Sequence, residues 1–132
     1  MKSFLTLIFF TILAGCQQNN GNIGSLFGLW KITAIEINEK SFLNNEDDLY
    51  FAFQGEVINL KKNEVWNHSR VDIFGSFIHQ EDSLFINCSE GNLSDLPIWA
   101  IYNKNWKFKI LFLDNKHISL SHDSIIWNLS KY

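Results

Sequence analysis

Residues 28–34 read GLWKITA, and this stretch decides the fold of the chain. Trp30, Ile32 and Ala34 alternate with other residues, as in a β-strand that buries one face. The next apolar residue, Ile35, falls on the opposite parity. One extra residue in a strand, a β-bulge, reverses the buried parity and bends the strand. We therefore expect a first strand with a bulge, which suits the closure of a barrel.

The rest of the chain repeats this alternation in short runs separated by polar turns. The polar residues at 38–48 and 61–64 are expected to form a loop and a turn. No helical period separates the apolar runs, so the sequence predicts antiparallel strands in a sandwich or barrel. Eight strands are expected, at residues 28–37, 49–53, 57–60, 65–78, 83–89, 106–112, 118–120 and 125–129.

Residues 92–102 interrupt the strand pattern. They contain the single proline of the chain, Pro97, and carry apolar side chains at Leu93, Leu96 and Trp99. A spacing of three residues is typical of a helical turn. We expect a short helical segment or plug here, with Trp99 placed at the mouth of the barrel.

The N-terminus has the composition of a secretion signal, assigned to residues 1–15. Lys2 supplies a positive charge, and an apolar run from Phe4 to Ala14 follows it. As a helix this run would be roughly 16 Å long. A membrane core is about 30 Å thick, so the run is too short to be a transmembrane anchor.

Leu13-Ala14-Gly15-Cys16 resembles the lipobox of bacterial lipoproteins. The resemblance implies cleavage before Cys16, lipidation of that cysteine and attachment to a membrane. A plain signal peptide with a chance cysteine is the alternative. Gln17 stands where an aspartate would indicate retention in the inner membrane, and no acidic residue follows it closely. We therefore expect an outer-membrane lipoprotein on the periplasmic face, with a tether at 16–24 and a folded domain at 25–132.

The composition argues against a nucleic-acid partner and against a core held by a disulfide. The net charge is −3 and the basic residues are scattered, so we expect no nucleic-acid partner. With Cys16 lipidated, Cys88 has no disulfide partner; it shares the parity of Leu84 and Ile86 and is expected to be buried. The core then depends on aromatic burial, for which the chain has 12 Phe, 5 Trp and 3 Tyr.

We find no constellation of residues that indicates catalysis. The four histidines do not have metal-ligand spacing, and neither a metal nor another cofactor is expected. His122-Asp123-Ser124 contains the residue types of a catalytic triad, but adjacency in sequence supplies no oriented base and no oxyanion hole. We interpret these residues as a turn, and we expect a protein that is not an enzyme.

Gly28-Leu29-Trp30 on a first strand, eight antiparallel strands and a basic residue closing the last strand resemble the lipocalin superfamily. The likeness is closest to small lipocalin-like domains of bacterial outer-membrane lipoproteins, and it covers residues 25–132. It implies an eight-stranded antiparallel up-and-down barrel. In lipocalins the first-strand Trp seals one end and a cation near the end of the last strand packs over it. The resemblance assigns these roles to Trp30 and Lys131.

The aromatic residues expected to face the interior allow two functional hypotheses. In the first, the barrel binds a small apolar ligand. In the second, the same side chains fill a narrow barrel, and the domain is a protein-interaction module, such as an envelope scaffold or an inhibitor of a periplasmic enzyme. An apolar cavity above about 300 Å³ would favour the first hypothesis. The candidate ligand-binding residues are Phe53, Phe77, Trp99, Phe108, Phe112 and Trp127.

Overall fold

The computed structural model describes residues 26–43, 47–64 and 70–132. The expected signal, Cys16 and the tether lie outside these residues. So does the start of the strand expected from residue 65. No helix among the described residues is long and apolar enough to cross a membrane.

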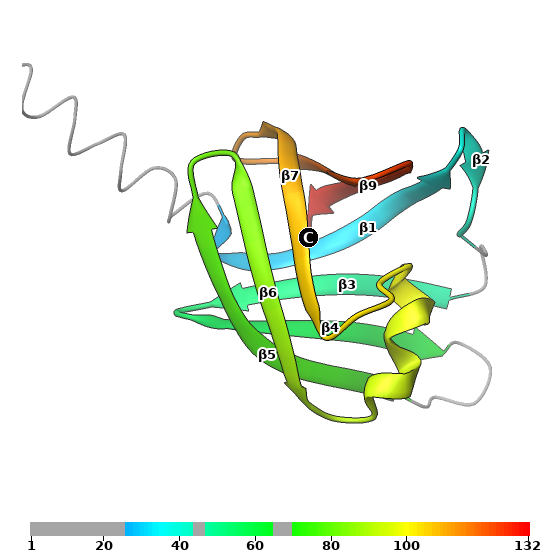
Figure 1. Cartoon of the computed structure of the whole chain (residues 1–132), viewed down its shortest axis with the longest axis vertical. Helices are drawn as coiled ribbons and strands as arrows, with labels where there is room; N and C mark the ends of the chain where they lie inside the picture. Colours follow the sequence, from blue (N-terminus) through cyan, green and yellow to red (C-terminus); the bar gives the residue numbers. More distant parts are fainter. Residues whose placement is uncertain (1–25, 44–46, 65–69) are drawn as a thin grey trace, which may run out of the picture.

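The prediction of an eight-stranded antiparallel up-and-down barrel is confirmed. Each long strand pairs with the next along the chain, and the last strand pairs with the first, which closes the barrel (Figure 1). A two-residue strand, β2, extends one edge of β1. The elements are β1 (Gly28–Ile37), β2 (Lys40–Ser41), β3 (Asp47–Gln54), β4 (Val57–Glu64), β5 (Arg70–Gln80), β6 (Ser83–Glu90), η1 (Leu93–Trp99), β7 (Asn105–Leu113), β8 (His117–His122) and β9 (Ile125–Lys131).

The bulge expected in the first strand is present. The register between β1 and β9 shifts at Thr33, between the pairs Ile32 with Leu129 and Ala34 with Asn128. The hydroxyl of Thr33 donates a hydrogen bond to the Asn128 carbonyl at 3.0 Å. The extra residue moves the buried side of β1 from even to odd positions, so Ile35 is fully buried.

Gly75 lies inside the strand expected at 65–78, where a glycine indicates either a bend or a close approach of two backbones. The structure has the close approach. A Cβ at this position would lie 2.2 Å from the Asn87 carbonyl oxygen of β6. The register between β5 and β6 also shifts between Phe74 and Gly75. Only glycine permits this contact, because the obstructing atoms belong to backbone.

Two of the expected boundaries were wrong. Residues 61–64 continue β4 to Glu64 instead of turning, because they pair with the first residues of β3, from Asp47. The loop expected at 38–48 contains β2, in which Ser41 pairs with Glu36. Polar residues form strand here because hydrogen bonding in a sheet ladder depends on backbone groups, whatever the side chain.

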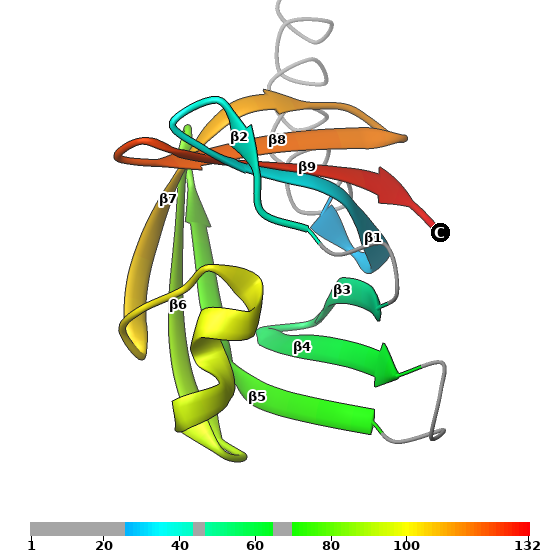
Figure 2. The same ribbon diagram turned by 90° about the vertical axis from the view of Figure 1, so that its right-hand side faces the viewer.

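The segment expected to be helical is the 3₁₀ helix η1, and it lies at the end of the barrel away from the start of β1 (Figures 1 and 2). The Asn92 side chain accepts a hydrogen bond from the Ser94 amide and caps the helix. The helix ends at Trp99, and the next residue, Ala100, caps it in a left-handed conformation with φ 59°. Leu96, Trp99 and the residues just after it are buried, so η1 closes this end as a plug.

Candidate functional site

Trp30 and Lys131 lie against each other at the end of the barrel where β1 begins and β9 ends. Trp30 is fully buried, and its indole N–H donates a hydrogen bond to the Leu26 carbonyl at 2.9 Å. The Lys131 ammonium lies 4.6 Å from the centre of the Trp30 ring and donates to the Phe27 carbonyl. Gly28 has φ 121°, and a Cβ there would be 2.5 Å from the Lys131 Nζ, so glycine leaves room for this lysine.

The barrel interior is filled by aromatic side chains. Phe53, Phe108 and Trp127 are buried, and the Phe108 and Trp127 rings meet edge to face with centres 4.8 Å apart. Trp127 donates its indole N–H to the Trp99 carbonyl at 2.7 Å, and Trp99 donates its own to the Lys61 carbonyl at 3.2 Å. These two bonds connect η1 to β9 and to β4.

Phe77 and Phe112 lie elsewhere. Phe77 is half-buried and packs edge to face on Phe53, with ring centres 5.0 Å apart. Phe112 is 51% exposed, so the expectation that it faces the interior was wrong. The register between β7 and β8 shifts between Ile110 and Phe112, and the extra residue, Leu111, turns Phe112 outward.

Three hollows are lined by described residues, with volumes of about 410, 270 and 530 Å³. None of the three has Phe53, Trp99, Phe108 or Trp127 in its wall. These four candidate ligand-binding residues are at most 1% exposed, which leaves no room for a water molecule against them, so they act as packing in this structure.

The hollow of about 410 Å³ lies on the outer wall of β5, β6 and β7, and we call it the wall groove. Six of its nine lining residues lie on the solvent-facing parity of the three strands, and between them run Phe77, Ile86 and Trp106, which lie on the inward parity. The six outward residues form two rows in register across the sheet. The first row is Ile78, Phe85 and Lys107, and the second is Ser76, Asn87 and Asn105.

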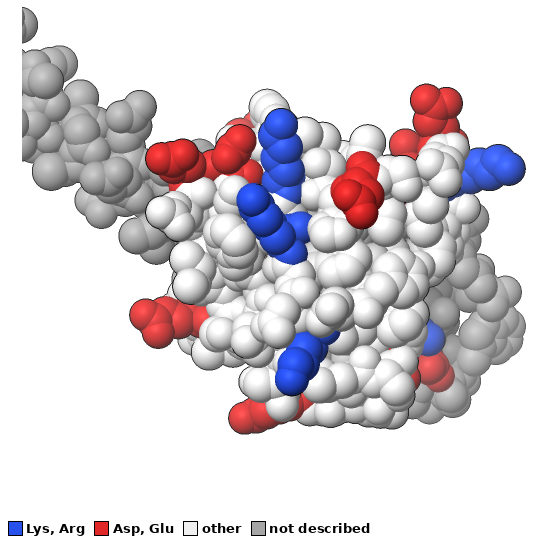
Figure 3. Space-filling view, in the orientation of Figure 1, with Lys and Arg blue, Asp and Glu red and all other residues white. Residues whose placement is uncertain are grey.

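Apolar and charged groups are both present in the wall groove. Ile78 and Phe85 are apolar, yet they lie on the face of the sheet that meets water. Ile78 is 63% exposed and Phe85 is 39% exposed. The Lys107 ammonium lies 5.4 Å from the centre of the Phe85 ring. In Figure 1 these three strands face the viewer, and Figure 3 shows that the same face is mostly uncharged.

The sequence interpretation missed the wall groove. It offered the outer faces of the barrel only in general, as the surface of an interaction module, and named no outward residue. The available signal was Phe85, an aromatic residue between Leu84 and Ile86, which are both buried. An apolar residue on the polar parity of a strand is a sequence-level sign of a surface with a partner.

Cys88 is buried and is the free cysteine among the described residues. Burial raises the pKa of its thiol to about 11. Because the thiolate is the reactive form, this cysteine is inert at neutral pH. It acts as a small apolar residue of the core, as expected from its parity.

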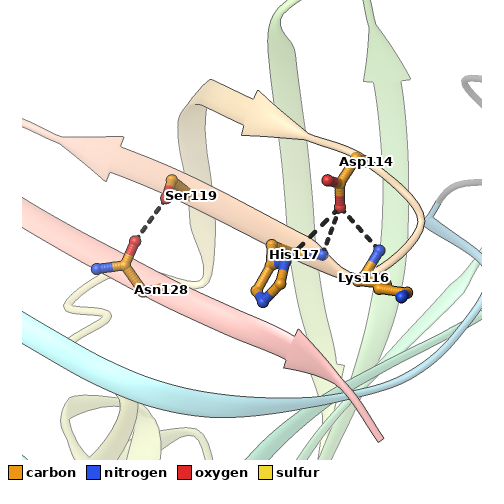
Figure 4. Close-up of polar contacts among 5 residues, drawn as sticks. All are labelled: Asp114, Lys116, His117, Ser119 and Asn128. Carbon is orange, nitrogen blue, oxygen red and sulfur yellow. Dashed lines mark hydrogen bonds and ion pairs between the residues drawn. The ribbon is translucent and has the colours of Figure 1, made fainter.

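The β7–β8 turn is held by Asp114 (Figure 4). Its carboxylate accepts hydrogen bonds from the backbone amides of Lys116 and His117 at 2.8 and 2.7 Å. These bonds stabilise the charged form and lower the pKa of Asp114. Figure 4 also shows the Ser119 hydroxyl donating to the Asn128 side chain between β8 and β9. Both sets of contacts stabilise the sheet.

The described histidines do not gather into a metal site. No group of three or more His, Cys, Asp or Glu side chains within the described ranges could hold a metal ion. His122 stacks on the Trp106 ring with centres 3.8 Å apart, and its Nδ1 lies 2.7 Å from the Lys107 carbonyl. Asp123 and Ser124 form the turn into β9 and are exposed.

A closed antiparallel barrel, sealed by a buried tryptophan at one end and a helical plug at the other, defines the class of small lipocalin-type barrels. The model of the lipocalin-like domain family matches residues 11–132, and the chain belongs to this family. No curated protein matches the chain.

Two solved structures are similar to this chain. One is a lipocalin-like protein from Bacteroides uniformis, with 13% identity and a TM-score of 0.70; the match covers 82% of this chain and 99% of that protein. The other is an uncharacterized protein from Bacteroides eggerthii, with 15% identity and a TM-score of 0.68; the match covers 81% and 99%. At such identities the likeness establishes the fold alone.

Proposed function

We propose that this protein is a lipid-anchored binding protein of the bacterial envelope, not an enzyme, and that it binds its partner on the outer wall of the barrel. The observation that carries the proposal is the packed interior. Trp30, Trp99 and Trp127 are fully buried in it, and the indole N–H of each has a backbone acceptor. An interior ligand would have to displace packed aromatic groups, each of which buries roughly 150–250 Å².

The outer wall supplies the alternative surface. The wall groove, at about 410 Å³, is within the size range of small-molecule sites, about 300–1,000 Å³. Its apolar residues Ile78 and Phe85 are exposed, which costs solvation free energy unless a partner covers them. These features favour binding on the outer wall over a ligand carried inside the barrel.

A second candidate function is the binding of a small apolar ligand beside the plug. The observation in its favour is the hollow of about 530 Å³ between η1 and the segment that follows it. Leu93, Leu96 and Pro97 line one side of this hollow, and Tyr102 lies on the other.

The two candidates differ in the expected response to an apolar ligand. Titration of dodecanoate into the unacylated Cys16→Ser protein, followed by calorimetry, is expected to show no saturable binding, because the interior is packed. A saturable one-to-one complex that Tyr102→Ala weakens and Phe85→Ala does not would contradict binding on the outer wall and support the second candidate. Wild-type protein heated past its transition and cooled serves as the control for non-specific uptake.

The anchor rests on Leu13-Ala14-Gly15-Cys16 after a short apolar run. A diacyl or triacyl cysteine binds membranes stably, because each buried CH₂ contributes about 0.8 kcal/mol. We expect Cys16→Ala to move the protein from the outer-membrane fraction to the soluble fraction. Cys88→Ala is the matched control and should leave the protein in the membrane fraction. Retention of Cys16→Ala on membranes after a salt wash would rule out this anchor.

A further inference from the structure

We propose that the wall groove binds an oligosaccharide that carries carboxylate groups. This inference rests on the proposed binding function of the outer wall and names the class of ligand. Three features of the groove carry it: an exposed aromatic face, a row of amide and hydroxyl groups in register, and a single charge, which is positive.

The aromatic face is that of Phe85, which is partly exposed in the middle of the first row. A sugar ring has an apolar face made of C–H groups and an edge of hydroxyl groups. The negative face of an aromatic ring attracts the C–H groups and shields them from water. Ile78, directly across from Phe85 on β5, extends this apolar surface.

The second row supplies the polar half of the site. Ser76 pairs with Asn87, and Asn87 pairs with Asn105, so the three side chains follow one line across the sheet. Neighbouring strands lie about 4.7–4.9 Å apart. An amide both donates and accepts hydrogen bonds, and a sugar hydroxyl does the same. A row of such groups beside an apolar strip matches the two sides of a sugar chain.

The charge of the groove selects among sugars. Lys107 is the charged residue among the nine that line the groove, and its ammonium lies over the Phe85 ring. A sugar carboxylate that draws this ammonium away from the Phe85 ring would form a charge-assisted hydrogen bond with it and would leave the ring face free for the sugar to stack on. The proposal therefore commits to acidic sugars over neutral ones.

Other occupants fit the groove less well. A fatty acyl chain would cover the amides of Asn87 and Asn105 and leave them without partners, which costs free energy. An extended peptide binds a sheet by adding a strand to a free edge. The backbone of β6 is already paired on both sides, with β5 and β7, so this wall offers no such edge.

The test is calorimetric titration of the unacylated Cys16→Ser protein with tetragalacturonate, with neutral maltotetraose as the comparison. We expect saturable binding of tetragalacturonate that weakens with added salt, and binding of maltotetraose at least about tenfold weaker. Lys107→Met should weaken tetragalacturonate at least about tenfold. Lys109→Met removes the same charge from the same face of β7 but lies outside the groove, and it should leave the affinity unchanged.

Phe85→Ala and Asn87→Ala should each weaken tetragalacturonate while leaving the thermal midpoint close to that of the parent, because both side chains point outward. The proposal is overturned if tetragalacturonate does not bind, if maltotetraose binds equally well, or if the two lysine variants lose the same affinity. If neither tetragalacturonate nor dodecanoate binds, the acidic-sugar proposal fails and the outer-wall function remains. Saturable dodecanoate binding at the hollow beside η1 would instead remove that function.

Discussion

Trp30→Ala is expected to unfold the domain or bring it close to unfolding. Truncating a buried tryptophan costs about 3–5 kcal/mol, whereas a whole domain of this size is stable by only about 5–15 kcal/mol. The substitution also leaves the Leu26 carbonyl without the indole donor that it has at 2.9 Å. Urea denaturation followed by near-ultraviolet circular dichroism would measure the loss.

Lys131→Met is the matched control for this prediction. It keeps the aliphatic stem over the Trp30 ring and removes the ammonium, which lies 4.6 Å from the ring centre. A cation–π contact contributes about 0.5–1 kcal/mol when exposed and about 2 kcal/mol when desolvated. The lysine variant should therefore remain folded. An unchanged urea midpoint for Trp30→Ala would show that Trp30 does not seal the barrel.

Trp99→Ala should cost a similar amount of stability, about 3–5 kcal/mol, and should also create a binding site. The indole of Trp99 fills the plugged end of the barrel, where its N–H bonds to the Lys61 carbonyl. The substitution keeps the backbone carbonyl of residue 99, which accepts a hydrogen bond from the Trp127 indole, so this bond is retained. Engineered apolar cavities of about 150 Å³ stay dry and bind small aromatic molecules. We therefore expect indole to bind Trp99→Ala and raise its thermal midpoint.

Two controls make this experiment decisive. Indole should leave the wild-type midpoint unchanged, since Trp99 already occupies the space. Tyr102→Ala removes an exposed aromatic side chain three residues further on and should change stability by no more than about 0.5 kcal/mol. A Trp99→Ala protein as stable as the wild type, without an effect of indole, would show that η1 does not plug the barrel.

Much of the fold could be predicted from the sequence because strand alternation is a local signal. The shift of apolar parity after Ala34 indicated the bulge in β1. The isolated Gly75 indicated either a bend or a close backbone approach, and the close approach is present. The extent of β4 was not predictable in this way. Its residues 61–64 are polar, and they form strand because β3 and β5 lie on either side and pair with their backbone groups.

The candidate site was predicted less well, for a physical reason. Alternation tells which side of a strand is buried, but it says nothing of whether the buried side chains leave space between them. Phe108 and Trp127 were correctly expected to face the interior, and Trp99 was expected in the plug at its mouth; only their packing shows that they fill the space. Phe112 was misplaced because a bulge at Leu111 cannot be seen in a run of apolar residues.

The pairing of β1 with β9 has a consequence for how the chain folds. The strand that holds Trp30 and the strand that ends at Lys131 come from opposite ends of the described chain. Contacts between distant residues form slowly, and sheet proteins dominated by them fold in about milliseconds to seconds. A chain that emerges N-terminus first cannot close this barrel until its last strand has emerged. Until Lys131 has emerged, β1 has no partner on the side that β9 will occupy, and the half-formed barrel leaves that sheet edge open to other chains.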